Sequence, residues 1–161
     1  MALFPPTIIL RHRKENLKKC SLSGLEKRSD MTFLRYPKDP MPDLTNYVVL
    51  TLNAPMLSMD DSSQGLCLID GTWRYAADIE KTVGPCIKRS LPPLIRTAYP
   101  RYQTLCPDPE TGLASIEALF FAYSLLGRDP RGLLDNYYWK KDFIEKNSSL
   151  FPSDFLPLRI L

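Results

Sequence analysis

The chain has 161 residues, of which 44% are hydrophobic and 24% are charged, and its formal net charge is +3. This length and composition indicate one soluble globular domain, or a domain with a small appendage, that can bury a core without disulfides. No apolar run is long enough for a transmembrane helix, and the opening MALFPPTIIL lacks the basic start of a signal peptide, so a cytoplasmic protein without membrane attachment is expected.

The first half of the chain predicts strands. Short β-branched or continuous apolar runs, bounded by prolines and turn formers, occur at Thr7–His12, Met31–Pro37, Tyr47–Pro55 and Gly65–Asp70. Continuous apolar strands are typical of a parallel sheet that is covered on both faces. KKCSLSGLEKR, between the first two runs, is expected to be a loop that leads into a short helical turn.

The second half predicts mainly helices. A helical pattern follows Trp73 through Lys81, and further helices are expected in Leu113–Gly127 and in Tyr137–Asn147, with Ser90–Gly112 largely irregular. The predicted fold class is therefore α/β, with a mostly parallel sheet in the N-terminal half and an all-helical C-terminal half. The corresponding parts are residues 1–84, an α/β part, and residues 85–161, a helical part.

Two predicted strands end in residues that suit a ligand site. LTLNAP carries Asn53 and Pro55, and IDGTW carries Asp70, Gly71, Thr72 and Trp73. Parallel α/β sheets bind ligands beyond the carboxyl ends of their strands, so these loops form one crevice if the strands are neighbours. The alternative is structural, with Asp70 as a helix N-cap and Trp73 as a core residue.

Other chemistry is set aside. The four cysteines, Cys20, Cys67, Cys86 and Cys106, form no C-x-x-C pair, and there is one histidine, His12, so neither a zinc site nor a disulfide framework is expected. Cys67 is expected in the core. Glycine-rich phosphate loops and Ser-His-Asp or Cys-His arrangements are also missing.

Positive charge is concentrated in two islands. Residues 11–28 contain seven Lys or Arg against two Glu, and residues 81–101 contain five Lys or Arg and no acid, while the rest of the chain is net negative. Such islands favour a phosphate-bearing partner such as RNA, although two solvated loops would give the same pattern.

Several motifs resemble two related families. LIDGTWRYA, RHRKE and GLASIEAL resemble the DTW-domain family of tRNA aminocarboxypropyltransferases. KKCSLSG, RSLPPLIRTAYPRY and YYWKKDFIEKN are similar to a sister family that modifies small-subunit rRNA, whose last helix has the spacing shown here by Trp139, Phe143 and Asn147. The chain departs from the sister family at DGTW, ENL and TAYPRY and by the added CPDPETG, and it lacks the cysteine cluster of the DTW family.

The resemblance implies a fold like that of the knotted SPOUT methyltransferases, with the helical part threaded through a trefoil knot at which S-adenosylmethionine (SAM) binds. The implied activity is transfer of the 3-amino-3-carboxypropyl (acp) group to a uridine-type base of RNA, with small-subunit rRNA slightly favoured over tRNA. A SPOUT-class RNA methyltransferase and a non-catalytic RNA-binding ribosome-assembly factor are the alternatives. A metal-free monomer is expected.

The resemblance also assigns roles. Trp73 and Ala76 wall the pocket of the methyl group, and the backbone at Leu52, Ile69 and Leu91 holds the adenosine near Pro55. Ser21 and Ser115 lie near the cofactor, and the Ser115 hydroxyl at a helix N-terminus would bind the amino-acid carboxylate of SAM, cap the helix, or do both. Asp70 is the favoured base or support for the sulfonium, with Asp60 and Asp61 as competitors. The expected cofactor-binding set is Ser21, Leu52, Asn53, Pro55, Ile69, Thr72, Trp73, Ala76, Leu91, Tyr102 and Ser115. The two basic islands supply the expected phosphate-binding set, which is Arg11, Lys18, Lys19, Lys88, Arg89, Arg96 and Arg101.

Overall fold

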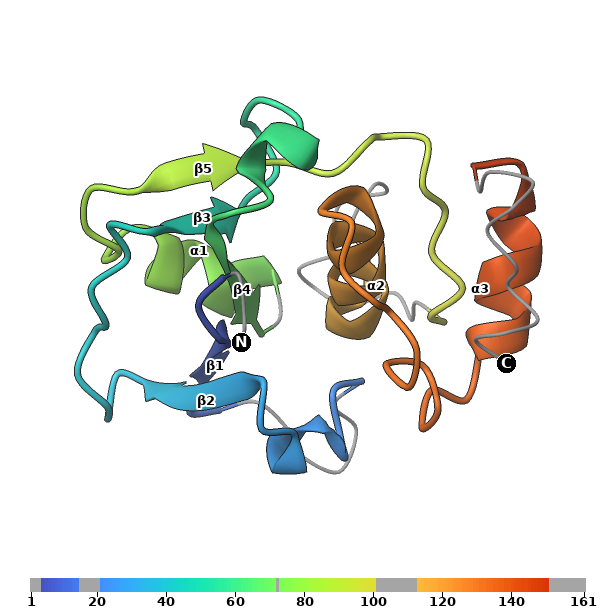
Figure 1. The fold of residues 1–161 in the computed structure, drawn as a ribbon. Coiled ribbons are helices and arrows are strands. Elements are labelled where there is room, and N and C mark those ends of the chain that lie inside the picture. Colours follow the sequence, from blue (N-terminus) through green and yellow to red (C-terminus); the bar gives the residue numbers. More distant parts are fainter. Residues whose placement is uncertain (1–3, 15–20, 72, 101–112, 151–161) are drawn as a thin grey trace.

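A computed structural model describes residues 4–14, 21–71, 73–100 and 113–150, with the backbone alone at residues 73 and 74 (Figure 1). It contains one sheet and three α-helices, with short 3-10 turns between them. No helix within these ranges is long and apolar enough to cross a membrane.

All five strands of the sheet are parallel, in the order β2-β1-β4-β3-β5. The strands are β1 (Thr7–His12), β2 (Met31–Tyr36), β3 (Tyr47–Leu50), β4 (Gly65–Asp70) and β5 (Ile87–Arg89). The parallel sheet and its first four strands are thus confirmed. The run predicted as Tyr47–Pro55 is shorter than expected, because the chain turns after Leu50.

Strand β5 was not predicted, and it lies in the half that was expected to be all helical. Only three residues long, β5 is the edge strand beside β3, and two of its side chains are exposed. Such a short strand shows no hydrophobic periodicity in the sequence, and it is recognised only by its backbone pairing with β3.

Both faces of the sheet are covered, as the continuous apolar strands predict. Helix α1 (Trp73–Glu80) packs on one face, where Ile79 meets Ile8, Leu10 and Cys67. Helices α2 (Ser115–Leu125) and α3 (Lys140–Lys146) lie beyond the other face (Figure 1). Cys67 is fully buried, as expected, and burial raises the pKa of its thiol to about 12.

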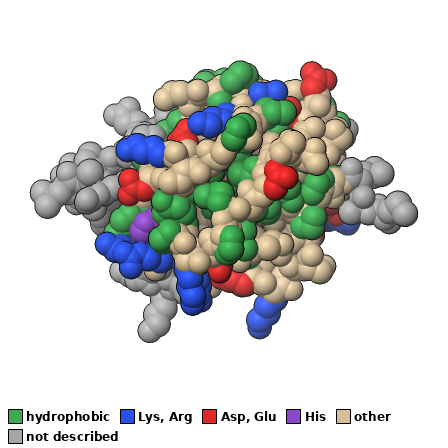
Figure 2. Space-filling view, turned by 90° about the vertical axis from the view of Figure 1, so that its left-hand side faces the viewer, with side chains coloured by type: hydrophobic (Ala, Val, Ile, Leu, Met, Phe, Trp, Pro, Cys, Tyr) green, Lys and Arg blue, Asp and Glu red, His purple; other side chains and the backbone are tan. Residues whose placement is uncertain are grey.

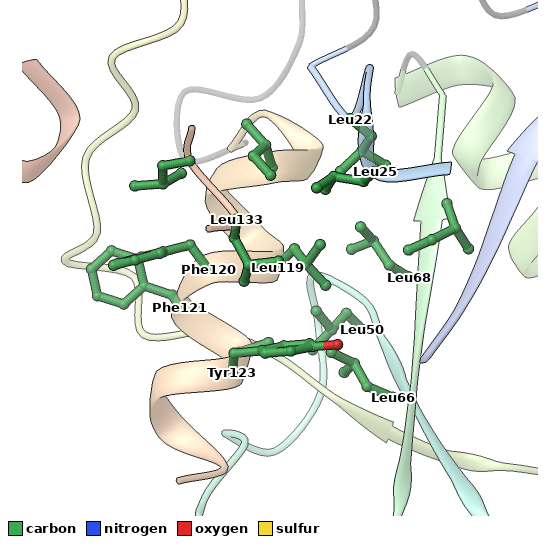
Figure 3. Close-up of a cluster of buried hydrophobic side chains, with 14 of the residues drawn as sticks. Leu22, Leu25, Leu50, Leu66, Leu68, Leu119, Phe120, Phe121, Tyr123 and Leu133 are labelled. Atoms are coloured by element: carbon green, nitrogen blue, oxygen red, sulfur yellow. The ribbon is translucent and has the colours of Figure 1, made fainter. Parts of the chain in front are cut away.

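The main core lies between the sheet and α2. Figure 3 shows Leu119 of α2 directed toward Leu68 of β4, with Leu50 and Leu66 beside them. Phe120 and Phe121 lie on the other side of α2, where both rings meet Phe143 of α3 edge to face. The continuous apolar sequence of α2 is explained by this position, since the helix is enclosed by the sheet and by α3.

Polar contacts fix the direction of α2 across the sheet. Its first residue, Ser115, contacts Asp70 at the carboxyl end of β4 (2.7 Å). Near its other end, the hydroxyl of Tyr123 bonds Thr7 at the start of β1 (2.8 Å). Helix α2 therefore runs antiparallel to the strands, and its N-terminus lies at the edge where the predicted site residues gather.

The segment after β5 is held between α2 and α3. Asn147, at the end of α3, accepts from Arg96 N (2.8 Å) and donates to Arg96 O (2.9 Å). The asparagine of the motif shared by Trp139, Phe143 and Asn147 therefore has a structural role, because it anchors an irregular segment to a helix end.

Candidate functional site

A buried polar network occupies the carboxyl edge of the two central strands. Arg11 of β1 lies opposite Asp70 of β4 in the register of the sheet, and its Nε donates to Asp70 Oδ2 over 3.0 Å. The other oxygen, Oδ1, accepts from the hydroxyl of Ser115. Asp70 is 2% exposed and Arg11 is 7% exposed, so the carboxylate links β1, β4 and α2 in the protein interior.

Arg11 has two further neighbours that fix its orientation. Its Nη1 lies 3.2 Å from Glu26 Oε1, and its guanidinium lies over the ring of Phe33 at 4.8 Å. Burial acts against ionisation of Glu26, but hydrogen bonds from backbone N–H groups and from Arg11 lower its pKa overall. Arg11, predicted to bind a phosphate, is thus an interior ion-pair residue in this structure.

Ser21 joins the same region. Its hydroxyl oxygen accepts from Ile116 N in the first turn of α2 (3.1 Å). A serine hydroxyl can accept and donate at the same time, so its proton remains available for an anionic group at this helix end. The predicted pair Ser21 and Ser115 is therefore brought together from positions far apart in the sequence.

The loop after β3 and the end of β5 form a rim beside this network. Thr51 N donates to Arg89 O (2.8 Å), and Ser90 N donates to Pro55 O (2.9 Å). The hydroxyl of Ser90 bonds Ala54 O (2.6 Å). These bonds place the predicted Leu91 close to the predicted loop residues, of which three are exposed: Leu52, Asn53 and Pro55. The predicted Ile69 is half-buried on the neighbouring strand β4.

Gly71 follows Asp70 in a crowded position. A Cβ atom at this residue would lie 3.3 Å from Tyr75 Cβ and 3.4 Å from His12 Cβ, so the close approach of β1 and α1 favours glycine. Ala76 lies half-buried in α1. Thr72, Tyr102, Lys18, Lys19, Arg101 and the side chain of Trp73 lie outside the described residues.

The two competing aspartates differ in their surroundings. Asp61 is buried, accepts from Ser58 N (3.3 Å) and pairs with Arg89 Nε (3.0 Å). Asp60 is exposed, and its carboxylate bonds no residue that the structure describes. Asp61 therefore stabilises the turn before β4, whereas Asp60 faces solvent.

The remaining residues that were predicted to bind phosphates also differ in their surroundings. Lys88 lies 3.6 Å from Glu80, and Arg89 is held by Asp61. Arg96 is exposed. Described His, Cys, Asp and Glu side chains form no cluster that would bind a metal ion.

Sequence reasoning missed Glu117, the most enclosed acid of the described chain. It is 0% exposed and accepts from Thr97 Oγ1 (2.6 Å), Ala98 N (2.8 Å), Ala114 N (2.9 Å) and the Tyr137 hydroxyl (2.9 Å). Burial, and then the nearby Glu117 carboxylate, raise the pKa of Tyr137 well above its ordinary value. The available signal was an acid in the first helical turn, where it can cap backbone N–H groups.

The fold and this edge define an α/β protein with a candidate small-molecule site at the carboxyl ends of parallel strands. No protein-family model matches the chain, and no curated protein matches it. Among solved structures, it is similar to the SAM-dependent rRNA acp-transferase Tsr3 from Vulcanisaeta distributa, at 25% identity and a TM-score of 0.69. The similarity covers 91% of this chain and 80% of that one, so the two share a fold over nearly the whole chain.

Proposed function

We propose that the protein is a SAM-dependent RNA acp-transferase that acts on a uridine-type base, with small-subunit rRNA favoured over tRNA. The observation that carries this proposal is the likeness to the rRNA acp-transferase, which extends over 91% of the chain. Resemblance of separate sequence motifs to the same enzyme class supports it independently.

The groups at the carboxyl edge fit SAM. A cationic sulfonium suits the vicinity of a carboxylate, and the amino-acid carboxylate suits the hydroxyl proton of Ser21 at the N-terminus of α2. The exposed Leu52 and the backbone of the β3–β5 rim offer an apolar surface and polar main-chain groups for a nucleoside. We assign adenosine binding to Leu52, Asn53, Pro55, Ile69, Thr72, Leu91 and Tyr102.

When bound, SAM supplies an electrophilic carbon on its amino-acid arm, with the sulfonium as leaving group. Trp73 and Ala76 are proposed to exclude the methyl group from the acceptor, so that orientation decides which carbon reacts. This chain would hold the acceptor nitrogen in line with that carbon, and one of its carboxylates would take up the proton that the nitrogen gives up.

Asp70 is proposed as the electrostatic support of this site. Its two oxygens already accept from Arg11 and Ser115, which holds the carboxylate in one orientation beside the N-terminus of α2. Proton removal is then assigned to a carboxylate that can reach the acceptor base. Asp60 is exposed, whereas Asp61 is ion-paired with Arg89.

The proposed architecture includes the trefoil knot, formed where residues 85–161 thread through the part made by residues 1–84. The resemblance of the sequence motifs to families with this fold supports this proposal. Comparing the refolding rate with that of a chain circularly permuted to open the knot would test it.

Two SAM preparations test the function, one labelled in the methyl group and one in the carboxyl carbon of the amino-acid arm. Incubation with small-subunit rRNA and with tRNA should transfer the carboxyl label to RNA and leave the methyl label in the nucleoside product. Transfer of the methyl label would instead show a methyltransferase. Failure to bind SAM at about millimolar concentration, with RNA still bound, would show a non-catalytic RNA-binding factor.

A further inference from the structure

A stack of aromatic rings lies at the end of β1, on the face of the sheet covered by α1. The imidazole of His12 is parallel to the ring of Tyr75, with 4.1 Å between centroids and 7° between planes. Tyr36, which pairs with His12 across β1 and β2, adds a tilted ring at 5.9 Å. Three aromatic residues from β1, β2 and α1 therefore converge at one edge of the sheet.

The accessible part of the stack belongs to the tyrosines. His12 is 7% exposed, whereas Tyr75 and Tyr36 are half-buried. Lys14 N donates to His12 Nδ1 (3.1 Å), and this hydrogen bond fixes the orientation of the imidazole ring. The tyrosine ring of α1 is consequently backed by a buried, hydrogen-bonded imidazole, which suits a stacking surface.

The stack borders the proposed transfer site. Gly71, directly after Asp70, lies in contact distance of both His12 and Tyr75. Tyr75 is the residue before Ala76 on α1. A group stacked on Tyr75 is therefore next to the strand end at which the acceptor base is proposed to react.

Exposed cations adjoin the stack in the sequence. Arg13 and Lys14 follow His12, and Lys38 comes two residues after Tyr36. Arg35 precedes Tyr36 on β2, so its side chain points to the opposite face of the sheet. None of the four takes part in an ion pair with a residue that the structure describes. Figure 2, viewed from the side away from α3, shows the histidine side chain beside several Lys and Arg side chains and near a broad hydrophobic area.

We propose that Tyr75, backed by His12, is a stacking subsite for an unpaired nucleobase beside the acceptor uridine, with Arg13 and Lys14 on the adjoining phosphates. This subsite rests on the proposed function and extends it by naming the form of RNA that binds. Bases in a duplex are already stacked, so an aromatic platform with nearby cations favours single-stranded RNA.

Binding of fluorescent oligouridylate, about ten nucleotides long, tests the subsite in the full-length protein. Tyr75→Leu should weaken binding on the order of tenfold, the usual effect of losing one stacked base, and Tyr75→Phe should restore it. The matched control is Tyr138→Leu, an 85% exposed tyrosine before α3, which should bind like wild type. An RNA duplex of the same length should bind less tightly than the single strand.

The cations are tested with the double variant Arg13→Ala/Lys14→Ala. The slope of log affinity against log salt should fall by about 1.4, or about 0.7 for each lost phosphate contact on a single strand. Lys140→Ala/Lys141→Ala, which removes two cations from α3, is the control and should change the slope less. Equal slopes for the two double variants would overturn the assignment of these phosphates.

SAM binding by calorimetry separates this inference from the proposed function. Tyr75→Leu should leave the affinity for SAM unchanged while it weakens the binding of oligouridylate. If wild type transfers the acp group and Tyr75→Leu still binds oligouridylate normally, the subsite is wrong and the function stands. If no variant transfers any group but Tyr75→Leu weakens oligouridylate, the subsite stands and the proposed reaction is wrong. Preferential binding of the duplex would contradict the single-stranded assignment.

Discussion

Glu117 shows how one side chain can define an irregular region. Its carboxylate receives four hydrogen bonds, two from the segment after β5, one from the residue before α2 and one from Tyr137 before α3. Glu117→Gln replaces one acceptor oxygen with an amide that also donates, and buried donors then lose their partners. We expect the free energy of unfolding to fall by about 3 kcal/mol, measured by urea denaturation.

A matched control exists on α3, because Glu145 is exposed. Glu145→Gln should change the free energy of unfolding by less than about 0.5 kcal/mol. An equal effect of the two substitutions would show that Glu117 does not anchor the segment.

Arg11 provides a second prediction, based on its buried ion pair with Asp70. Arg11→Met leaves that carboxylate without its cation, so the free energy of unfolding should drop by about 3–5 kcal/mol. The salt dependence of RNA binding, measured under conditions where the variant is folded, should stay the same. Arg13→Met, at an exposed neighbouring residue, should leave the free energy of unfolding unchanged and should reduce the salt dependence of RNA binding. If Arg11→Met is stable and the salt dependence of its RNA binding is reduced, Arg11 binds a phosphate as the sequence predicted and is not an interior ion-pair residue.

At the scale of elements, the contact between β1 and α1 depends on an uncharged imidazole. Burial lowers the pKa of His12 below its ordinary value of 6.5, Arg13 and Lys14 lower it further, and Asp78 opposes them. The unfolded chain therefore takes up this proton at higher pH than the folded one. The stability that His12 contributes is complete above about pH 6.5 and is lost as pH falls from there toward the folded pKa.

The measurement is urea unfolding at about pH 7.5 and about pH 5.5. His12→Phe keeps a ring against Tyr75 but removes the titrating group, so its stability should decline less between the two conditions. Identical declines in wild type and variant would exclude His12 as a contributor.

Elements with strong local patterns were predictable. Strands β1 and β4 have the bounds expected from their apolar runs, and the cores of α1, α2 and α3 lie within the predicted ranges. Strand β5 could not be predicted, because three residues at a sheet edge are too few to show a hydrophobic periodicity. The approach of Ser21, Asp70 and Ser115 followed from the resemblance, but the sequence could not show that Arg11 completes the network, since burial depends on which strand lies beside it.

For the whole molecule, SAM should act as a stabilising ligand. A cofactor that binds only the folded state at about a hundred times its Kd adds about 2.7 kcal/mol. For a chain of this size, that corresponds to a rise of about 5–10 °C in Tm. Differential scanning fluorimetry with and without SAM measures it.

Trp73→Ala is expected to fold but to show no such rise, and Tyr138→Ala is the control that retains it. A normal rise in Trp73→Ala would remove this tryptophan from the cofactor site.

The bond between Thr7 and Tyr123 joins groups 116 residues apart. During synthesis, β1 therefore leaves the ribosome well before the helix that covers it exists. Until α2 has been made, the apolar side of the sheet around Ile9 and Leu68 remains open to other nascent chains and to chaperones. Such a chain completes its folding late, and nonsense mutations that remove α2 leave an aggregation-prone fragment rather than a smaller folded protein.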